Sequence, residues 1–586
     1  MVDMEDILDI DEESECSEPD NLSYDLDADT VRLPPQNLST TSTSEDWMLE
    51  DWELLECCTS EDSHSDCSEK EPGDNAQGNI RTGCNGTCWS ENPPTEKETP
   101  SRNVLREQSG PANGITTRSP KDAWDLFVSD NMLEEICKCS NFEGRRTATL
   151  KKKVWKNISK NELVAFFGIC LLAGYEKSWD VSIRELFGNS LSNPLYRATM
   201  SIIRFEAIRR FLRFDDKRTR EFRMQKEQMA EFRYIWDLFI VNCRKRFAPS
   251  ECVTVDEQLV PFKGRCRFNQ YMPSKPAKYG IKIFWLCDSK TYYAVNGIPY
   301  TGKQPGQETQ RNVGFHIVQQ LCSQLRGTGR NITMDNYFTS VPLAEALIEK
   351  GLSLVGTLRL NKKDIPDHMK PSKNRELFSA EFGFKQDITM VSYVPRKGKA
   401  VVLLSTMHHD KSVQEESKKK KPDIITYYNS TKGGVDLMDK MVRTYSCKRQ
   451  TRRWPMVMWY NVMDVAHLNA YVLFTSQHPE FHPGANYKRR LFLKELVQEM
   501  VTPHMRSRLQ ENSKLQKTIV ASIDICMEIL GQQSQIASRQ EQGPQKRKRC
   551  CYCPSKIDRK ISMTCKKCEK HVCKEHSCVV CLECFQ

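Results

Sequence analysis

The chain has 586 residues, and because one domain usually takes about 100–200, the length excludes a single small domain. With 39% hydrophobic and 28% charged residues, the composition is that of a soluble protein with a sizeable core. No stretch approaches the roughly 18–20 uninterrupted apolar residues of a membrane span, so we expect no membrane partner.

The net charge of +9 conceals two oppositely charged regions. Residues 1–70 contain 23 Asp and Glu but only two basic residues, whereas residues 71–586 contain 84 Lys and Arg against 54 Asp and Glu. This basic body suits a polyphosphate partner, although charge alone also fits an ordinary soluble surface. The first residues lack the features of a signal peptide, so we expect the protein inside the cell, with its 25 cysteines as thiols or metal ligands.

Residues 1–117 are acidic and rich in Ser, Thr, Asn, Gly and Pro, without sustained periodicity, and we expect them to be disordered. From residue 118 to 251, apolar residues recur at helical spacing, as in Leu163, Phe166 and Cys170. Basic residues lie beside these apolar stripes. They fit either a solvated helix face or contacts with phosphate groups.

From residue 252 the pattern changes to short β-type runs separated by helical segments. The expected strands are 253–260, 281–287, 292–295 and 331–334, with a helix near 314–325. Residues 366–424 have the character of an insertion, with β-type pieces at 388–393 and 400–404. Long helical stretches follow at 454–474 and 487–508, and residues 511–549 are linker-like. Strands and helices with acids at strand ends favour an α/β nuclease core.

Four aspartates stand at the ends or starts of these elements. Asp256 lies in the first strand-like run, Asp335 follows the buried strand, and Asp436 and Asp439 begin the helix after a Gly-Gly pair. Carboxylates gathered in this way suit a pair of Mg²⁺ ions, which take oxygen ligands and assist phosphoryl chemistry. For Asp436 and Asp439, which share a helical face, the alternative is a favourable interaction with the helix macrodipole.

Basic residues cluster beside these acids in the sequence. Such a track holds a DNA backbone in register, and we expect DNA contacts from the group, although any single member also fits a solvated surface charge. The expected DNA-contacting cations are Lys263, Arg265, Lys275, Lys278, Lys282, Arg359, Lys362, Arg449, Arg452 and Arg453.

Residues 550–586 contain nine cysteines at a spacing typical of zinc modules. Four pairs with two-residue gaps supply eight ligands, enough for two tetrahedral Zn²⁺ ions that would provide much of the folding energy of so short a segment. We predict a cross-brace, with sequential pairing as the alternative. The first ion then takes Cys550, Cys553, Cys573 and His576, and the second takes Cys565, Cys568, Cys581 and Cys584.

Several longer motifs resemble the piggyBac transposase family. They are Val255-Asp256-Glu257-Gln258-Leu259, Lys263-Gly264-Arg265-Cys266, Pro273-Ser274-Lys275-Pro276, Met334-Asp335-Asn336-Tyr337-Phe338, Lys432-Gly433-Gly434-Val435-Asp436 and Arg452-Arg453-Trp454-Pro455-Met456. The resemblance runs from about residue 120 to residue 586, and its motifs are long and specific.

This resemblance implies an α/β RNase H-like catalytic core with an insertion, flanked by a split α-helical DNA-binding domain. It implies cut-and-paste transposition at TTAA sites through DNA hairpins. Asp256, Asp335 and Asp436 then hold two Mg²⁺ or Mn²⁺ ions, and Asp439 matches an additional acidic position. Trp454 is expected near the active site, where it either stacks on an unpaired base or belongs to the core. The cysteine-rich end resembles the part of the family that recognises terminal-repeat DNA.

The expected domain boundaries combine these patterns with the resemblance. They are 1–117 for the disordered acidic region, 118–251 and 457–535 for the helical DNA-binding and dimerisation domain, 252–365 and 425–456 for the catalytic core, 366–424 for the insertion, 536–549 for a basic linker and 550–586 for the zinc module.

We therefore predict a DNA transposase that acts on terminal inverted repeats and a TTAA target in double-stranded DNA, with no small-molecule substrate. We expect a homodimer, because two element ends must meet. The basic run Lys546-Arg547-Lys548-Arg549 predicts a nuclear location. One alternative is a catalytically silent, host-adopted DNA-binding descendant. The second is a zinc-module interaction protein of the RING or PHD kind, such as a ubiquitin ligase.

Overall fold

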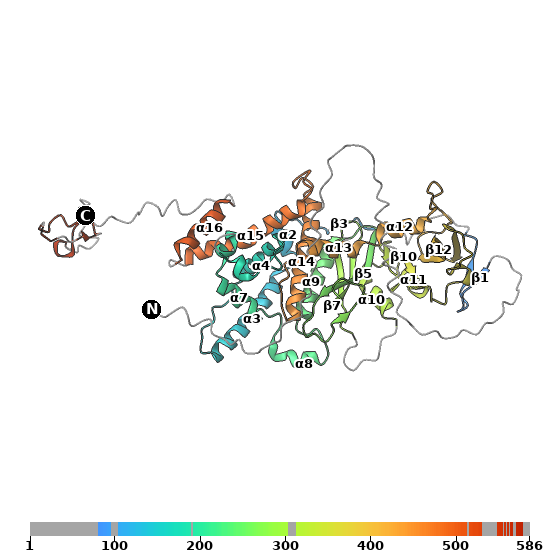
Figure 1. Ribbon diagram of the computed structural model, residues 1–586, viewed down its shortest axis with the longest axis horizontal. Coiled ribbons are helices and arrows are strands. Elements are labelled where there is room, and N and C mark those ends of the chain that lie inside the picture. The colour runs from blue at the N-terminus through green and yellow to red at the C-terminus, as the bar shows by residue number, and fades with distance from the viewer. Residues whose placement is uncertain are drawn as a thin grey trace. The chain divides into compact units, whose positions relative to one another are not determined.

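The computed structural model describes residues 80–94, 104–188, 192–302, 312–511 and 515–529, and in the C-terminal module residues 548–554, 556–557, 560–561, 563–565 and 570–577 (Figure 1). Residues 1–69 form one unit and residues 70–586 another, and every element below belongs to the second. The predicted disorder of residues 1–79 lies outside the described residues.

A group of helices precedes the sheet, as the apolar periodicity predicts. They are α2 (Pro120–Asp125), α3 (Asp130–Leu150), α4 (Lys160–Tyr175), α5 (Ile183–Leu186), α6 (Pro194–Thr199), α7 (Ile202–Phe211), α8 (Arg220–Met224) and α9 (Arg233–Arg246). Serine hydroxyls cap several of them: Ser159 accepts from the backbone N–H of Glu162, and Ser201 from that of Arg204. Such caps satisfy amides that have no partner within the helix and so fix where each helix begins.

The central strands are β5 (Cys252–Pro261), β6 (Gln270–Tyr271), β7 (Tyr279–Asp288), β8 (Ala294–Pro299), β9 (Asn331–Met334) and β10 (Ser353–Leu358). β7 pairs antiparallel with β5, β6 and β8, whereas β5, β9 and β10 run parallel in that order. Parallel neighbours need crossover connections, and α10 (Val313–Leu321) and α11 (Val341–Ile348) lie in the segments that lead into β9 and β10. The carboxyl ends of β5 and β9 therefore lie at the same edge of the sheet.

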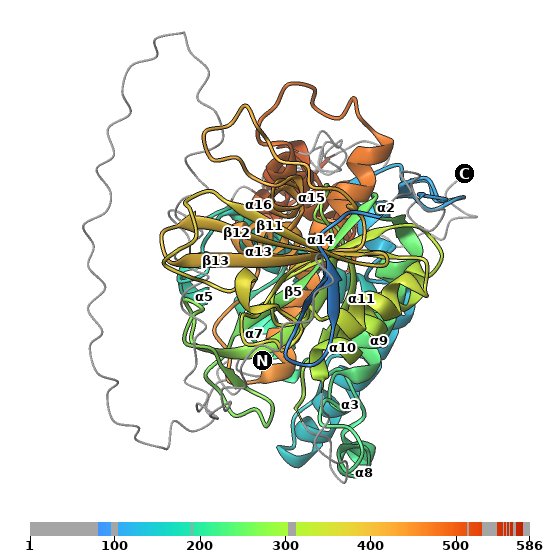
Figure 2. The same cartoon turned by 90° about the vertical axis from the view of Figure 1, so that its right-hand side faces the viewer.

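The strands of the predicted insertion extend this sheet. β11 (Ala380–Lys385), β12 (Ile388–Arg396) and β13 (Lys399–Ser405) form an antiparallel set in which β13 pairs with β10. Figure 2 shows this set in front of the central strands. The insertion therefore adds to the sheet through main-chain hydrogen bonds.

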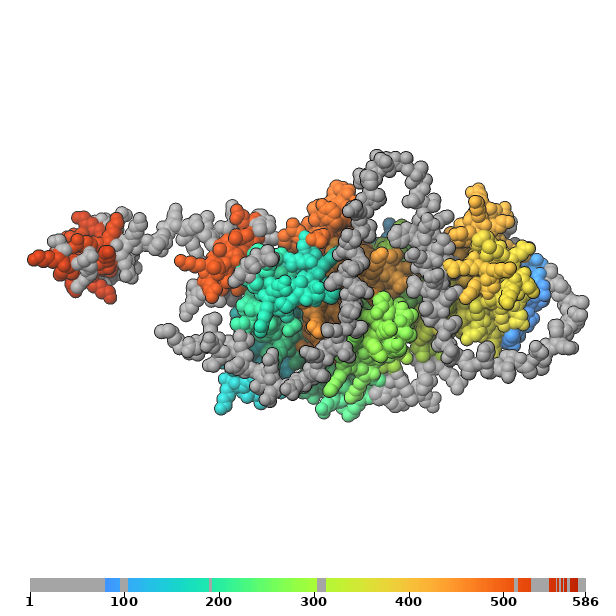
Figure 3. Space-filling view, in the orientation of Figure 1, coloured from blue at the N-terminus to red at the C-terminus, as the bar shows by residue number. Residues whose placement is uncertain are grey.

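The prediction that residues 1–117 are disordered is wrong for the segment 80–94. There β1 (Ile80–Thr82) and β2 (Cys88–Ser90) form a hairpin that pairs with β11, and the blue hairpin lies against the yellow insertion in Figure 3. Trp89 is 1% exposed, and its indole N–H donates to the carbonyl of Asp364 at 2.9 Å. A polar composition did not reveal this segment, because its stability comes from one tryptophan and the free edge of a distant strand.

Residues 104–117 are also ordered, against the same prediction. β3 (Gly110–Pro111) pairs with β4 (Phe247–Ala248), and Glu107 forms an ion pair with the fully buried Arg330 at 2.8 Å. Further along, the Thr117 amide and hydroxyl both donate to the Gln477 side-chain oxygen. This arm is held by specific polar contacts, which composition does not predict.

From the end of the insertion onward, the described residues form the α-helices α12 (Asp423–Thr431), α13 (Gly434–Thr444), α14 (Trp454–Gln477), α15 (Lys488–Glu511) and α16 (Lys517–Ile529). α15 packs on α4, where a side chain at Gly168 would lie 2.9 Å from Val501, so the close approach requires glycine. The linker-like interpretation of residues 511–549 is wrong for α16, which buries Ile523 and packs on α6. Within the described residues, no helix is both long and apolar enough to cross a bilayer.

Candidate active site and Cys/His centre

Asp256 and Asp335 lie side by side on neighbouring parallel strands. Val255 of β5 is in register with Met334 of β9, and each aspartate is the next residue along its strand. Neighbouring strands are about 4.8 Å apart, so the two aspartates come together at this edge of the sheet. They also share a face, because Thr254 and Thr333, two residues earlier, both contact Thr431 of α12.

These threonines and a glycine bring α13 onto the same face. Thr254 donates to the Thr431 carbonyl at 2.7 Å, and the Thr333 and Thr431 hydroxyls are 2.8 Å apart. A side chain at Gly434 would lie 2.5 Å from the Thr254 hydroxyl, so the first turn of α13 lies directly against β5. Asp436, two residues further on, is thereby placed near Asp256, whose pKa its charge helps to raise. The packing also explains the Gly-Gly pair that the sequence shows before this helix.

Gln258, which was not among the predicted site residues, holds Asp439 in place. The Gln258 side-chain N–H donates to Asp439 Oδ1 at 2.7 Å, and Arg443 pairs with Asp439 Oδ2 at 2.6 Å. The Gln258 oxygen accepts from Trp285 Nε1 and from Asn461 Nδ2, each at 3.0 Å. These two donors hold the buried amide with its N–H₂ toward Asp439, because the reversed orientation would place donor against donor. The pattern of β5 offers a signal: Gln258 lies two residues after Asp256, so the alternation of the strand places both side chains on one face.

Negative charge accumulates where these acids meet. Burial raises the pKa of Asp256 well above its ordinary value, and the charges of Glu257, Asp335 and Asp436 raise it further. Burial and the neighbouring Glu257 raise the pKa of Asp335 to about 6, against the backbone N–H of Tyr337, which lowers it. Carboxylates that repel one another in this way are stabilised by a cation placed among them.

The donor set of this site fits a hard divalent cation. The groups are carboxylate oxygens, and Mg²⁺ prefers oxygen ligands. The aspartates do not form a closed cluster, however. Within the described part of the chain, the only group of three or more Asp, Glu, His or Cys ligand atoms lying within 4.8 Å of one another is in the C-terminal module. The ligand atoms of Asp256, Asp335 and Asp436 therefore do not all lie within 4.8 Å of one another, and a cation would neutralise their mutual repulsion.

The predicted basic residues take several different positions. Lys275 lies near the acids: burial lowers its pKa, and the charges of Asp256 and Glu257 outweigh this and raise it. Lys263, Arg265 and Arg452 line a cleft of about 1920 Å³ that also reaches Asp439. Four of the other six lie elsewhere: Lys282 and Arg359 flank the Tyr337 ring at 5.0 and 5.7 Å, Lys278 is exposed, and Lys362 is half-buried.

The structure gives Arg449, Arg453 and Trp454 internal partners, which corrects the expected DNA contacts. The Arg449 guanidinium donates to the carbonyls of Ser178 and Val181, and Arg453 donates to the Leu212 carbonyl. Trp454 is 9% exposed and packs edge-on against Phe268 at 5.0 Å. Sequence alone does not show whether a cation or an aromatic side chain will face a carbonyl, a ring or solvent.

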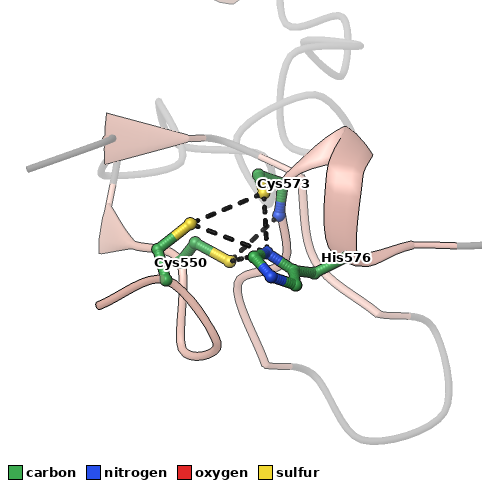
Figure 4. A group of neighbouring side chains, drawn as sticks. Cys550, Cys573 and His576 are labelled. Atoms are coloured by element: carbon green, nitrogen blue, oxygen red, sulfur yellow. Dashed lines mark hydrogen bonds between the residues drawn. The ribbon is translucent and has the colours of Figure 1, made fainter. Parts of the chain in front are cut away.

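Four ligands of the C-terminal module come together (Figure 4). Cys550, Cys553, Cys573 and His576 form the only close ligand group that the described residues contain. Cys553 Sγ lies 3.7 Å from Cys573 Sγ and 3.6 Å from His576 Nδ1, and Cys550 Sγ lies 3.8 Å from the same nitrogen. Tetrahedral zinc with bonds of about 2.0–2.3 Å separates its ligands by about 3.5–3.8 Å, so this Cys₃His group fits Zn²⁺.

The grouping joins the first Cys pair to the third pair, as the cross-brace prediction requires, and not to the second pair as in sequential pairing. Two short strands, β14 (Lys548–Arg549) and β15 (Lys560–Ile561), pair beside it. Exposed Cys551 lies outside the group. For the predicted second ion, Cys565 is described and is not in the group, whereas Cys568, Cys581 and Cys584 lie outside the described residues.

Comparisons with known proteins identify the family and fold of this chain. The Transposase IS4 family model matches residues 119–471. A cryo-EM structure of a piggyBac transposase synaptic complex with hairpin DNA matches with a TM-score of 0.69 and 36% identity, covering 82% of this chain and 100% of that one. Two human relatives, piggyBac transposable element-derived proteins 3 and 2, are 27% and 24% identical over 372 and 374 residues. Those matches span 60% and 61% of both this chain and the relatives.

The mixed α/β sheet, with Asp256 within β5 and Asp335 directly after β9, together with these matches, defines the class as a transposase. Within that class, the chain belongs to the piggyBac-type transposase family.

Proposed function

We propose that the protein is a DDD-type DNA transposase that excises and integrates a DNA element at TTAA sites through hairpin intermediates. The observation that carries this proposal is the juxtaposition of Asp256 and Asp335 on adjacent parallel strands, with α13 held on the same face. The core would be RNase H-like, and the helical segments before and after it would form the split DNA-binding domain.

The residues of the site divide the work between them. Asp256, Asp335 and Asp436 would hold two Mg²⁺ or Mn²⁺ ions. When bound, such ions activate a water or 3′-hydroxyl and stabilise the leaving oxygen. Asp439 keeps its orientation through Gln258 and Arg443, and Lys275, whose pKa the charges of Asp256 and Glu257 raise, would bind the phosphate that is cut. Without a cation, the ionised carboxylates repel each other. A bound divalent ion would therefore favour their ionised form.

The wider assembly follows from the same proposal. The similar structure is a synaptic complex with hairpin DNA. For this chain we propose double-stranded terminal repeats and TTAA target DNA as partners, a homodimer that joins two ends, and a nuclear location. The C-terminal module would bind two Zn²⁺ ions, the first at the Cys₃His group, and would recognise the terminal repeats.

Plasmid excision in cells tests the function, using terminal repeats from the source genome. Wild type should restore TTAA at the excision site, whereas Asp335→Asn should lower excision by at least about 10³-fold, because one metal ligand is lost. Asp410→Asn, an exposed acid of the insertion, is the matched control and should excise normally.

One observation favours a second candidate. The human relatives carry the names of transposable element-derived proteins. A silent, host-adopted DNA-binding protein would bind the repeats specifically but give no excision with wild type, and that outcome would overturn the catalytic proposal.

A further inference from the structure

The cleft that reaches Asp439 is formed by segments distant in the sequence. The turn at 179–182 and α5 contribute to its lining, and so do the end of β5, the following loop and residues 448–452. Gln258 and Asn461 also line it, so the cleft leads to the site described above. At about 1920 Å³ it has room for several nucleotides.

The cleft lining carries free positive charge. Arg184, Lys263, Arg265 and Arg452 are exposed, and none pairs with a carboxylate in the described residues. Of the four lining acids, Asp464 is engaged by the Ser446 hydroxyl and the Cys447 amide, and Asp439 by Gln258 and Arg443, whereas Asp180 and Glu206 form no ion pair in the described residues. The four free cations therefore outnumber the two free acids. Cations left without partners in a concave surface attract a polyanion such as a nucleic-acid backbone.

Trp179 adds an aromatic surface to this basic cleft. Its side chain is 67% exposed, the largest exposed fraction among the described tryptophans. The turn that bears it is rigidly held: the buried Arg449 guanidinium donates to the carbonyls of Ser178 and Val181 on either side, and the Ser178 amide donates to Ala173 at 2.9 Å. The indole is therefore presented from a fixed turn.

We propose that this cleft binds an unpaired DNA strand, with Trp179 stacking on a nucleobase and Lys263, Arg265 and Arg452 binding phosphates. This rests on the proposed function only for the role of the strand, as the DNA flanking the cut. Aromatic side chains interleaved with cations are the usual platform for single strands. An unpaired strand is favoured over duplex because the faces of bases inside a duplex already stack on each other. Trp454, for which stacking and a core position were both predicted as alternatives, is buried, whereas Trp179 is exposed and available to stack.

A binding assay with full-length protein carrying Asp335→Asn, which prevents cleavage, tests the proposal. The probe is a 12-nucleotide thymidine oligonucleotide with one 2-aminopurine, compared with the same sequence as duplex. Trp179→Ala should weaken single-strand binding by roughly 5- to 150-fold, the range for one base stacked on an aromatic ring, and should abolish 2-aminopurine quenching. Trp179→Phe should restore most of both.

Two further variants separate stacking from general charge and folding. Phe222→Ala removes a 64% exposed aromatic outside the cleft and should leave binding unchanged. Arg265→Gln should weaken binding and lower the salt slope by about one, because one phosphate contact is lost. Unchanged affinity and quenching in Trp179→Ala would overturn the proposal, and so would equal weakening for duplex and single strand.

The outcome is distinguishable from that of the excision test. If wild type excises the element and Trp179→Ala binds the single strand with unchanged affinity, only the assignment of the cleft is overturned. If Trp179→Ala loses single-strand binding and wild type gives no excision, the assignment of the cleft is supported and only the proposed transposition is overturned.

Discussion

The acidic site and the Cys/His centre are built in opposite ways. The Cys/His ligands all come from residues 550–576, whereas the acids come from β5, the end of β9 and α13. The acids are placed by a large apolar core and by side-chain contacts between distant segments. The described part of the module buries few apolar side chains, including Val572, and its cysteines converge at distances that suit a bound ion. One site is therefore positioned by packing between distant segments and the other by ligands close together in the sequence that suit a bound ion, and substitutions should separate the two.

Loss of a cysteine ligand should have the largest effect. Structural zinc contributes about 10–16 kcal/mol of binding energy in small modules, so Cys573→Ser should unfold the module while the body stays folded. Zinc analysis of the purified protein should show one ion fewer, and terminal-repeat binding should fall. Cys551→Ser, an exposed cysteine outside the group, is the control and should keep both. Full zinc content in Cys573→Ser would contradict the predicted site.

Adding a methyl group at the start of α13 should displace Asp436 and lower activity. Gly434→Ala places a carbon 2.5 Å from the Thr254 hydroxyl, so the helix that carries Asp436 must shift. A displacement of about 1 Å can cost about 10²-fold in rate, and we expect excision to fall by that order. Gly433→Ala is closely matched, because its new carbon would meet only Leu437, at 3.4 Å, and it should remain active. Equal activity of the two variants would show that the close approach does not position Asp436.

Removal of the amide that holds Asp439 should have a smaller effect. Partners that orient metal-site groups contribute about 10–100-fold in metal affinity, so Gln258→Leu should raise the Mg²⁺ concentration for half-maximal DNA cleavage by about tenfold or more. Asn469→Leu removes another fully buried amide, which bonds to Ala294, and controls for lost stability. It should destabilise the protein without changing the Mg²⁺ dependence. An unchanged Mg²⁺ concentration for half-maximal cleavage in Gln258→Leu would show that Gln258 does not support the metal site.

The smallest effect concerns pH. Burial raises the pKa of Asp464 to about 7 from an ordinary value of 3.8, despite hydrogen bonds from Cys447 and Ser446 that lower it. Between about pH 4 and 7 the unfolded chain releases this proton while the folded protein keeps it, so this group makes stability fall as pH rises. Asp464→Asn should flatten the dependence of the urea midpoint on pH in that window. Asp367→Asn, with an 83% exposed side chain, should not.

Periodicity predicted most of the central elements. The expected strand at 331–334 is β9, the run at 253–260 is β5 within one residue at each end, and the helix at 454–474 is α14 with three further residues. β11 was missed because its burial does not alternate strictly, and β1 and β2 because their polar sequence is stabilised by pairing with a distant strand edge. α16 lies inside the predicted helical part 457–535, although the composition of the residues around it had favoured a linker.

The sequence by itself determined what depends on neighbouring residues: strand and helix periods, Cys pairs with two-residue gaps, and acids placed at the ends of strand-like runs. Tertiary structure decided what depends on distant partners. It placed α13 against β5, turned Gln258 toward Asp439, engaged Arg449 and Arg453 with carbonyls, buried Trp454 and exposed Trp179. The physical reason is that the free energy of a polar or aromatic side chain depends on what surrounds it, and those surroundings come from segments far away along the chain.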